Sequence, residues 1–152
     1  MRNRLILSSK HLAPLVEIII AVVFFAGVST ILVQVFATAH NNSRFAHDIN
    51  NATLFVSECA ERIRTSDSYD AVIDALHQSG FRDGDNDNVY YAYLDASFSP
   101  TSRDFAYSMV TFEESVKDSE AGRLVIGQFV CVRRDGNELI RMDTAVFLPK
   151  ST

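Results

Sequence analysis

Residues 18–33 read IIIAVVFFAGVSTILV, and this uninterrupted apolar stretch decides the fold of the chain. Only Gly27, Ser29 and Thr30 are not plainly apolar, and helices that cross membranes accept such small residues. With its apolar neighbours on both sides, the stretch approaches the roughly 20 residues that an α-helix needs to cross hydrocarbon. We therefore predict a transmembrane helix over residues 14–37.

Residues 1–13 form a basic leader, which contains Arg2, Arg4 and Lys10 and no acidic residue. A cleaved secretory signal is the alternative, but its apolar core spans only about 7 to 15 residues and a domain starts after it. Here the sequence after the apolar stretch still has a helical pattern, which favours a retained anchor. Because Lys and Arg near a membrane helix stay in the cytoplasm, we expect a single-pass protein with a cytoplasmic N-terminus and an extracytoplasmic C-terminal domain.

The rest of the chain is acidic, because all 19 Asp and Glu but only 11 of the 14 Lys and Arg lie outside the leader. Phosphate binding needs concentrated Lys and Arg, so nucleic acid is not an expected partner. Membrane lipid is the partner that the apolar stretch predicts.

The helix is expected to continue outside the membrane, because Gly27 is the only glycine and no further proline occurs between Pro14 and Gly80. Over residues 38–66, apolar side chains recur every three or four positions on one stripe, and polar residues such as Asp48 are expected on the solvent side. The stripe could dock on the chain's own sheet or form a seam between copies, and its short length favours docking. It consists of Phe45, Ile49, Ala52, Val56, Cys59 and Ile63.

Residues 67–152 are predicted to fold as a small α+β domain. A short amphipathic helix over residues 69–79 ends at Gly80, and strand patterns follow over residues 89–95, 105–112, 123–133 and 138–148. Asp135-Gly136-Asn137 predicts a hairpin turn between the last two strands. The predicted fold class is therefore α+β, with a long N-terminal helix packed on a small antiparallel sheet.

Two further groups of residues in the exported part have more than one interpretation. Cys59 and Cys131 could form a disulfide in an oxidising compartment, or could be two buried free thiols. Asp83, Asp85 and Asp87 place oxygen ligands at alternating positions, as calcium loops do. The twelfth position of an EF-hand loop counted from Asp83 is Leu94, so a solvated turn is the preferred interpretation and no cofactor is expected.

Catalytic motifs are absent from the sequence. It contains no G-x-S-x-G, Walker or dinucleotide-binding pattern, and its four histidines do not combine with the two cysteines at zinc-ligand spacing. We therefore do not expect an enzyme.

Glu17 is a carboxylate at the very start of the apolar stretch, where an unpaired charge is costly. Together with the basic leader, Ala13-Pro14-Leu15-Val16-Glu17 and the long helix, it resembles the N-terminus of type IV pilins and type II secretion pseudopilins. This resemblance implies cleavage between Leu12 and Ala13 by a prepilin peptidase, and pairing of Glu17 with the amine of a neighbouring subunit. It implies a structural subunit that assembles with like subunits or other pilin-like proteins.

The motif differs from the family pattern at the cleavage position. Family members usually have Gly before the cut and an aromatic residue after it, whereas this chain has Leu12 and Ala13. The alternative function is a single-pass membrane protein that displays an extracytoplasmic binding module and does not polymerise.

Overall fold

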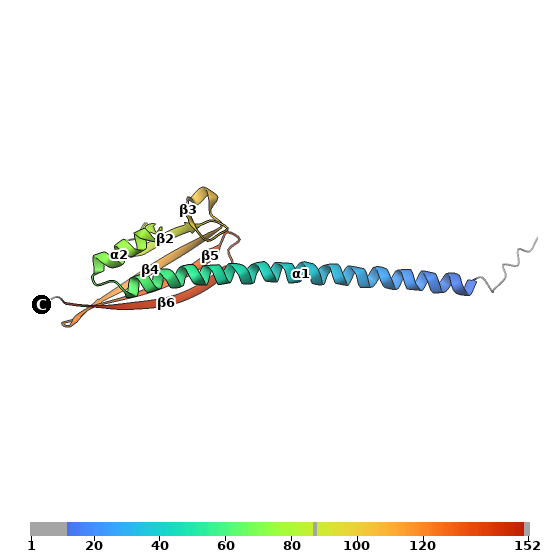
Figure 1. Ribbon diagram of the computed structural model, residues 1–152, viewed down its shortest axis with the longest axis horizontal. Helices are drawn as coiled ribbons and strands as arrows, with labels where there is room; N and C mark the ends of the chain where they lie inside the picture. Colours follow the sequence, from blue (N-terminus) through green and yellow to red (C-terminus); the bar gives the residue numbers. More distant parts are fainter. Residues whose placement is uncertain (1–11, 87, 151–152) are drawn as a thin grey trace, which may run out of the picture. The chain divides into compact units, whose positions relative to one another are not determined.

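The computed structural model describes residues 12–86 and 88–150, and it has the predicted α+β fold (Figure 1). A long helix leads into a second helix and then an antiparallel sheet. The elements in chain order are α1 (Leu12–Arg64), α2 (Tyr69–Gln78), β1 (Arg82–Asp83), β2 (Val89–Leu94), β3 (Pro100–Thr101), the 3₁₀ helix η1 (Arg103–Phe105), β4 (Ser108–Asp118), β5 (Gly122–Arg133) and β6 (Glu138–Pro149).

The chain divides into two units, Met1–Phe45 and Ala46–Thr152, and α1 contributes to both. In the first unit, every described side chain from residue 14 to residue 45 is exposed. The second unit contains the buried core, and we call it the folded domain. It contains α1 from residue 46 to residue 64, and also α2.

The strands of the described residues form one six-stranded sheet in the order β1-β2-β4-β5-β6, with β3 paired to β2. Every pairing is antiparallel. The β4–β5 ladder runs from Ser108 opposite Arg133 to Asp118 opposite Arg123. The predicted turn joins β5 to β6, where Gly136 adopts a φ of 87° and its amide donates to the carbonyl of Arg133 at 2.9 Å. This positive φ is the reason that glycine is needed there.

The core lies between one face of the sheet and the two helices. Ala52, Val56 and Ile63 of the predicted stripe are buried, so α1 docks on the chain's own sheet as expected, whereas Phe45 is exposed. Aromatic rings fill the space between the layers: Phe81 lies 5.9 Å from Phe129, and Phe112 lies 4.6 Å from Phe129, centroid to centroid. Alternate residues of each strand point into this core, as the period of a half-buried strand requires.

Candidate functional site

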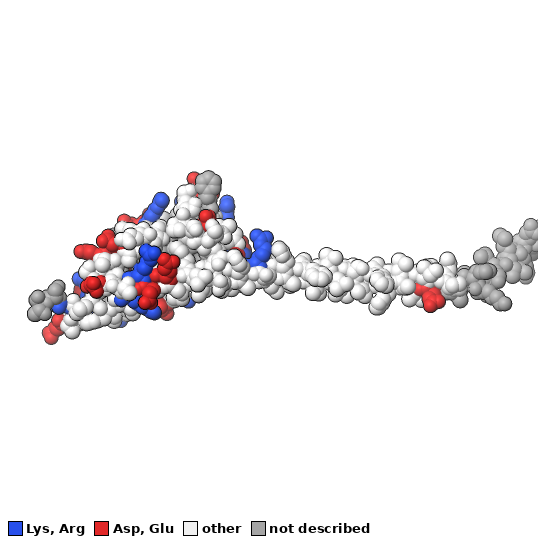
Figure 2. Space-filling model, viewed as in Figure 1, with Lys and Arg blue, Asp and Glu red and all other residues white. Residues whose placement is uncertain are grey.

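The exposed apolar half of α1 is the feature that most needs an explanation. In the part of the chain that the structure describes, it is the one helix long and apolar enough to cross a membrane, and none of its most apolar window is buried. Figure 2 shows this stretch as almost uniformly uncharged. Ile20, Val23, Phe25 and Phe36 are each more than 60% exposed. Water solvates such a surface poorly, so the stretch needs lipid or other apolar helices around it.

The two hydroxyl groups of residues 18–33 form hydrogen bonds within the helix itself. Ser29 Oγ donates to the carbonyl of Phe25 at 2.8 Å, and Thr30 Oγ1 donates to the carbonyl of Ala26 at 3.0 Å. Hydrocarbon offers no hydrogen-bonding partner, so polar side chains there must bond to their own helix or to a neighbour. These two bonds satisfy both hydroxyl groups of residues 18–33, as a helix in lipid requires.

Glu17 lies in α1 close to its start, and its side chain is exposed. It is the one charged residue between the start of α1 and Arg44, and no described residue pairs with it. Leu12 and Ala13, the residues of the predicted cleavage bond, lie in the first turn of the same helix. An exposed carboxylate in this position is available to a cation from another molecule.

A buried carboxylate ties α1 to the sheet inside the folded domain. Asp48, which we expected on the solvent side, is only 6% exposed. Tyr107 Oη donates to Asp48 Oδ2 at 2.6 Å, and Arg133 Nη1 donates to the same oxygen at 3.1 Å. The expectation was wrong because a helical pattern places a polar residue such as Asp48 on the solvent side by default. It does not show that Tyr107 and Arg133, which are distant in the sequence, supply the hydrogen bonds that allow Asp48 to be buried.

Arg133 connects Asp48 to the β5–β6 turn. Its guanidinium also bonds to Asp135, and this ion pair together with the amide of Asn137 lowers the pKa of Asp135 to about 2. The hydrogen bond to Asp48 raises the pKa of Tyr107 above its ordinary value. We call Asp48, Tyr107 and Arg133 the helix clamp, because their hydrogen bonds join α1 to the sheet.

A second buried carboxylate, Glu114 of β4, lies under α2. Tyr69 Oη donates to Glu114 Oε1 at 2.5 Å, and Tyr90 Oη lies 3.5 Å from the same oxygen. Burial, and then the neighbouring carboxylate, raise the pKa values of both tyrosines. Glu114 is 4% exposed, and among the described residues its second oxygen has no partner. Glu114 therefore joins α2 to the sheet through the hydrogen bond from Tyr69.

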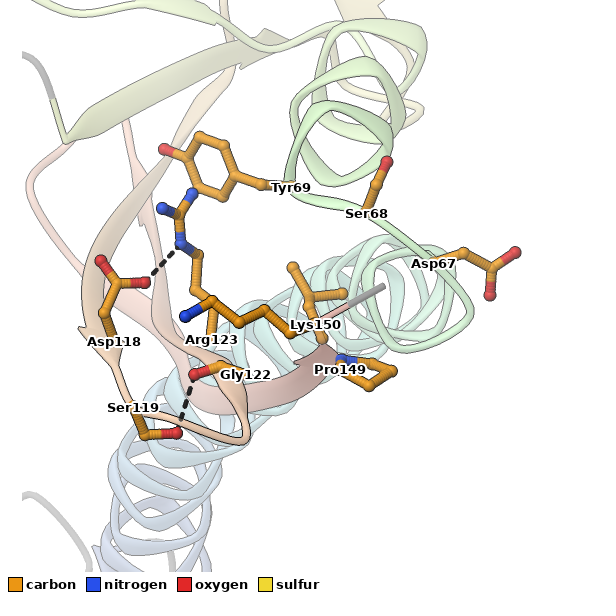
Figure 3. A pocket seen from close by; sticks show the side chains of 10 residues that line it. Asp67, Ser68, Tyr69, Asp118, Ser119, Gly122, Arg123, Pro149 and Lys150 are labelled. Carbon is orange, nitrogen blue, oxygen red and sulfur yellow. Dashed lines mark hydrogen bonds and ion pairs between the residues drawn. The ribbon is translucent and has the colours of Figure 1, made fainter. Parts of the chain in front are cut away.

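A pocket of about 520 Å³ lies where the start of α2 meets the β4–β5 turn (Figure 3). Arg123 Nε donates to Asp118 Oδ1 at 2.7 Å, and the guanidinium lies 5.2 Å from the ring centroid of Tyr69. Lys150 extends toward them from the end of the sheet, whereas the side chain of Asp67 points away. The charge of Arg123 is already balanced by Asp118. The described residues that line the pocket do not include a nucleophile next to a general base.

The two cysteines are free and buried in this structure, so the disulfide considered above is not formed in it. Burial raises the pKa of each thiol to about 11. Thiols with raised pKa values are poor nucleophiles, and these two act as small apolar core residues.

The residues considered for calcium are only partly described. Asp83 Oδ1 lies 3.1 Å from His77 Nε2, a contact that the sequence did not predict, and Asp85 is exposed. Asp87 lies outside the described residues. Within the described ranges, no three His, Cys, Asp or Glu side chains are grouped so that they could hold a metal ion.

No protein-family model matches the chain, and neither a curated protein nor a solved structure is similar to it. Function is therefore inferred from the residues and their geometry alone.

Proposed function

We propose that this chain is a membrane-anchored structural subunit, similar to a pilin or pseudopilin, which assembles with other subunits through its N-terminal helix. The observation that supports the proposal most is the single carboxylate, Glu17, on the exposed apolar half of α1, which is long enough to cross a membrane. A structural role also agrees with the described pockets, whose charged groups are engaged in ion pairs or open to solvent. Catalysis has no such support.

The chemistry of assembly follows from the cost of charge in hydrocarbon. An isolated carboxylate near lipid is unfavourable, and pairing with a cation from a neighbouring helix relieves that cost. The free amine of a subunit cleaved between Leu12 and Ala13 would supply such a cation close to Glu17. One ion pair in an otherwise apolar bundle would fix the register of neighbouring helices, because sliding either helix leaves both charges unpaired.

The proposed orientation places the basic leader in the cytoplasm and the folded domain outside it. Arg2, Arg4 and Lys10 support this orientation, because positive residues close to a membrane helix are retained on the cytoplasmic side. Protease added to intact cells should then digest the folded domain and leave the N-terminal end protected.

Mass spectrometry of the membrane-extracted protein tests the processing step. We expect a mature N-terminus at Ala13. An intact leader would contradict cleavage and would favour the alternative function, an anchored module that displays its domain without polymerising.

Cross-linking between neighbouring helices in membranes tests the role of Glu17. Glu17→Gln keeps the size and removes the charge, so we expect membrane insertion to persist and cross-linking between copies to fall at least tenfold. Glu17→Asp keeps the charge and is the matched control, with cross-linking largely retained. Equal cross-linking in the wild type and Glu17→Gln would overturn the pairing role.

A further inference from the structure

A basic pocket of about 370 Å³ lies at the end of the sheet where β5 turns into β6. Its floor is a cross-strand row, in which Tyr93 lies opposite Met109 and Met109 lies opposite Val132. These side chains belong to the sheet face opposite the core, since they alternate with buried neighbours along their strands. Arg103 and Arg134 also line the pocket. We call these five residues the basic pocket.

The two arginines of the basic pocket are free to bind an anion. Arg133, which also lines the cavity, is occupied by Asp48 and Asp135. Among the described residues, the side chains of Arg103 and Arg134 have neither an ion pair nor a hydrogen bond, and both are exposed. Guanidinium groups bind carboxylates through two parallel hydrogen bonds. Tyr, Met and Arg together are also the residue types enriched in protein–protein interfaces.

An acidic surface of complementary charge occurs on the same chain. Asp67, Asp70 and Asp74 lie just before α2 and along its exposed side, and all three are exposed. Asp70 and Asp74 are four residues apart and so share one face of the helix. No described residue forms an ion pair with any of the three. We call these three residues the acidic patch.

The basic pocket and the acidic patch of one copy lie at opposite ends of the β4–β5 ladder. The pocket is at the Ser108–Arg133 end. The start of α2 is at the Asp118–Arg123 end, because Arg123 lies over the ring of Tyr69 at 5.2 Å. At a rise of about 3.3 Å per residue, the two ends are roughly 33 Å apart. The basic pocket of one copy therefore cannot reach the acidic patch of the same copy, whereas it can reach that of a second copy.

We propose that the basic pocket of one copy binds the acidic patch of a second copy, so that folded domains contact each other head to tail. In this arrangement each copy offers its pocket to one neighbour and its patch to another, so the contact is heterologous and repeats along an assembly. The folded domains are acidic overall and therefore repel one another. The contact between the basic pocket and the acidic patch gives neighbouring copies a specific attraction. This inference rests on the proposed assembly of the chain and names the surfaces that its folded domains use.

Photo-cross-linking of the full chain in native membranes tests the identity of the occupant. A photoreactive amino acid in place of Met109, on the floor of the pocket, should form adducts with residues 67–74 of a second copy. The same amino acid in place of Phe147, which is exposed on β6 away from the pocket, is the control and should not label that segment. Labelling from position 109 of another protein, or of lipid alone, would overturn the proposal.

Exchanging the charges of one arginine and one aspartate tests whether the two surfaces attract each other. Arg134→Glu and Asp70→Arg should each reduce cross-linking between folded domains about fivefold, and the double variant should restore it, because the two charges are then exchanged. Arg82→Glu reverses an exposed charge outside the pocket and should leave cross-linking unchanged. Circular dichroism checks that each variant is folded. A double variant as weak as the single variants would contradict the pairing.

The two proposals fail in different ways. If copies cross-link through α1 but Arg134→Glu has no effect, the head-to-tail contact is wrong and assembly through the helix stands. If the wild-type chain shows no contact between copies at all, the proposed assembly is wrong as well.

Discussion

The two halves of α1 have similar helical geometry and opposite surroundings. From residue 14 to residue 45 every described side chain is exposed, although most of them are apolar. From residue 46 to residue 64 the apolar stripe is buried against the sheet, and polar residues cover the other side. Local propensity makes both halves helical, so the difference lies in what each apolar surface contacts. The first half needs an apolar environment from outside the chain, and the second half finds one in the folded domain.

The largest effect is expected where the second half of α1 is buried. Ile63 is 1% exposed, and Ile63→Ala should reduce the free energy of unfolding of the folded domain by about 2–5 kcal/mol, through lost burial and the resulting cavity. Ile31 of the same helix is 62% exposed, and Ile31→Ala is the matched control that should leave this free energy unchanged. Thermal unfolding in detergent, followed by near-ultraviolet circular dichroism, measures both. Equal losses in the two variants would contradict the division of α1.

A lysine placed at an exposed position of α1 shows whether that position is surrounded by lipid or by water. Val23 is 66% exposed and Leu54 is 62% exposed, so their side chains differ little in contact with the chain itself. Val23→Lys should oppose membrane insertion by about 2.5–3.5 kcal/mol and move protein into the soluble fraction, because the ammonium would lie in hydrocarbon.

Leu54→Lys is the control for this charge insertion. It should leave the membrane-bound fraction unchanged, because Leu54 faces water in the second half of the helix. Carbonate extraction followed by quantitative blotting measures both variants, and release of both or neither would contradict the assignment.

The helix clamp should contribute less than the core. Asp48→Asn removes the charge that pairs with Arg133 and should lower the free energy of unfolding by about 1–3 kcal/mol. Glu61→Gln alters an exposed carboxylate of the same helix and should have an effect within about 0.5 kcal/mol. A loss no greater than that of the control would show that the clamp does not hold α1 on the sheet.

The features of this fold that can be predicted are those whose residues lie close together in the sequence. The apolar stretch, the docking stripe and the turn at Gly136 were predicted because each is a local pattern. The hydrogen bond from Tyr107 to Asp48 joins residues 59 positions apart, and that from Tyr69 to Glu114 joins residues 45 positions apart. A local pattern in the sequence does not indicate such distant pairs. The burial of Asp48 and of Glu114 was therefore not predicted.

Strand boundaries show the same limit. The predicted strand over residues 105–112 ended where the apolar alternation stops, but β4 begins at Ser108 and continues to Asp118. Ladder pairing with β5 extends it through polar residues such as Glu113 and Lys117. The two-residue strands β1 and β3 are too short to produce a pattern. The basic pocket was missed because its residues come from four separate segments of the chain.

The smallest effect near neutral pH concerns the buried thiols, because their titration changes the stability only at alkaline pH. Burial raises the pKa of Cys59 and of Cys131 from 9.0 to about 11, so the folded state keeps these protons when the unfolded state has lost them. The stability that this provides is complete below pH 9 and is lost as the pH rises through about 11. Unfolding measured between pH 8 and pH 11 should show the decline, with the Cys59→Ala and Cys131→Ala double variant less sensitive.

Alkylation of the same thiols is the complementary measurement. Iodoacetamide at pH 8 should label neither cysteine in the native protein and both in urea. Rapid labelling of the native protein would contradict the burial, and absence of labelling in urea would indicate a disulfide.

We propose that residues 14–37 of α1 lie in lipid. Spin labels at positions 23 and 54 of the full chain in lipid vesicles test it directly, because oxygen concentrates in hydrocarbon and a polar nickel chelate remains in water. We predict that the label at position 23 is relaxed mainly by oxygen and the label at position 54 mainly by nickel. Strong relaxation by nickel at position 23 would contradict the membrane-spanning role of this helix.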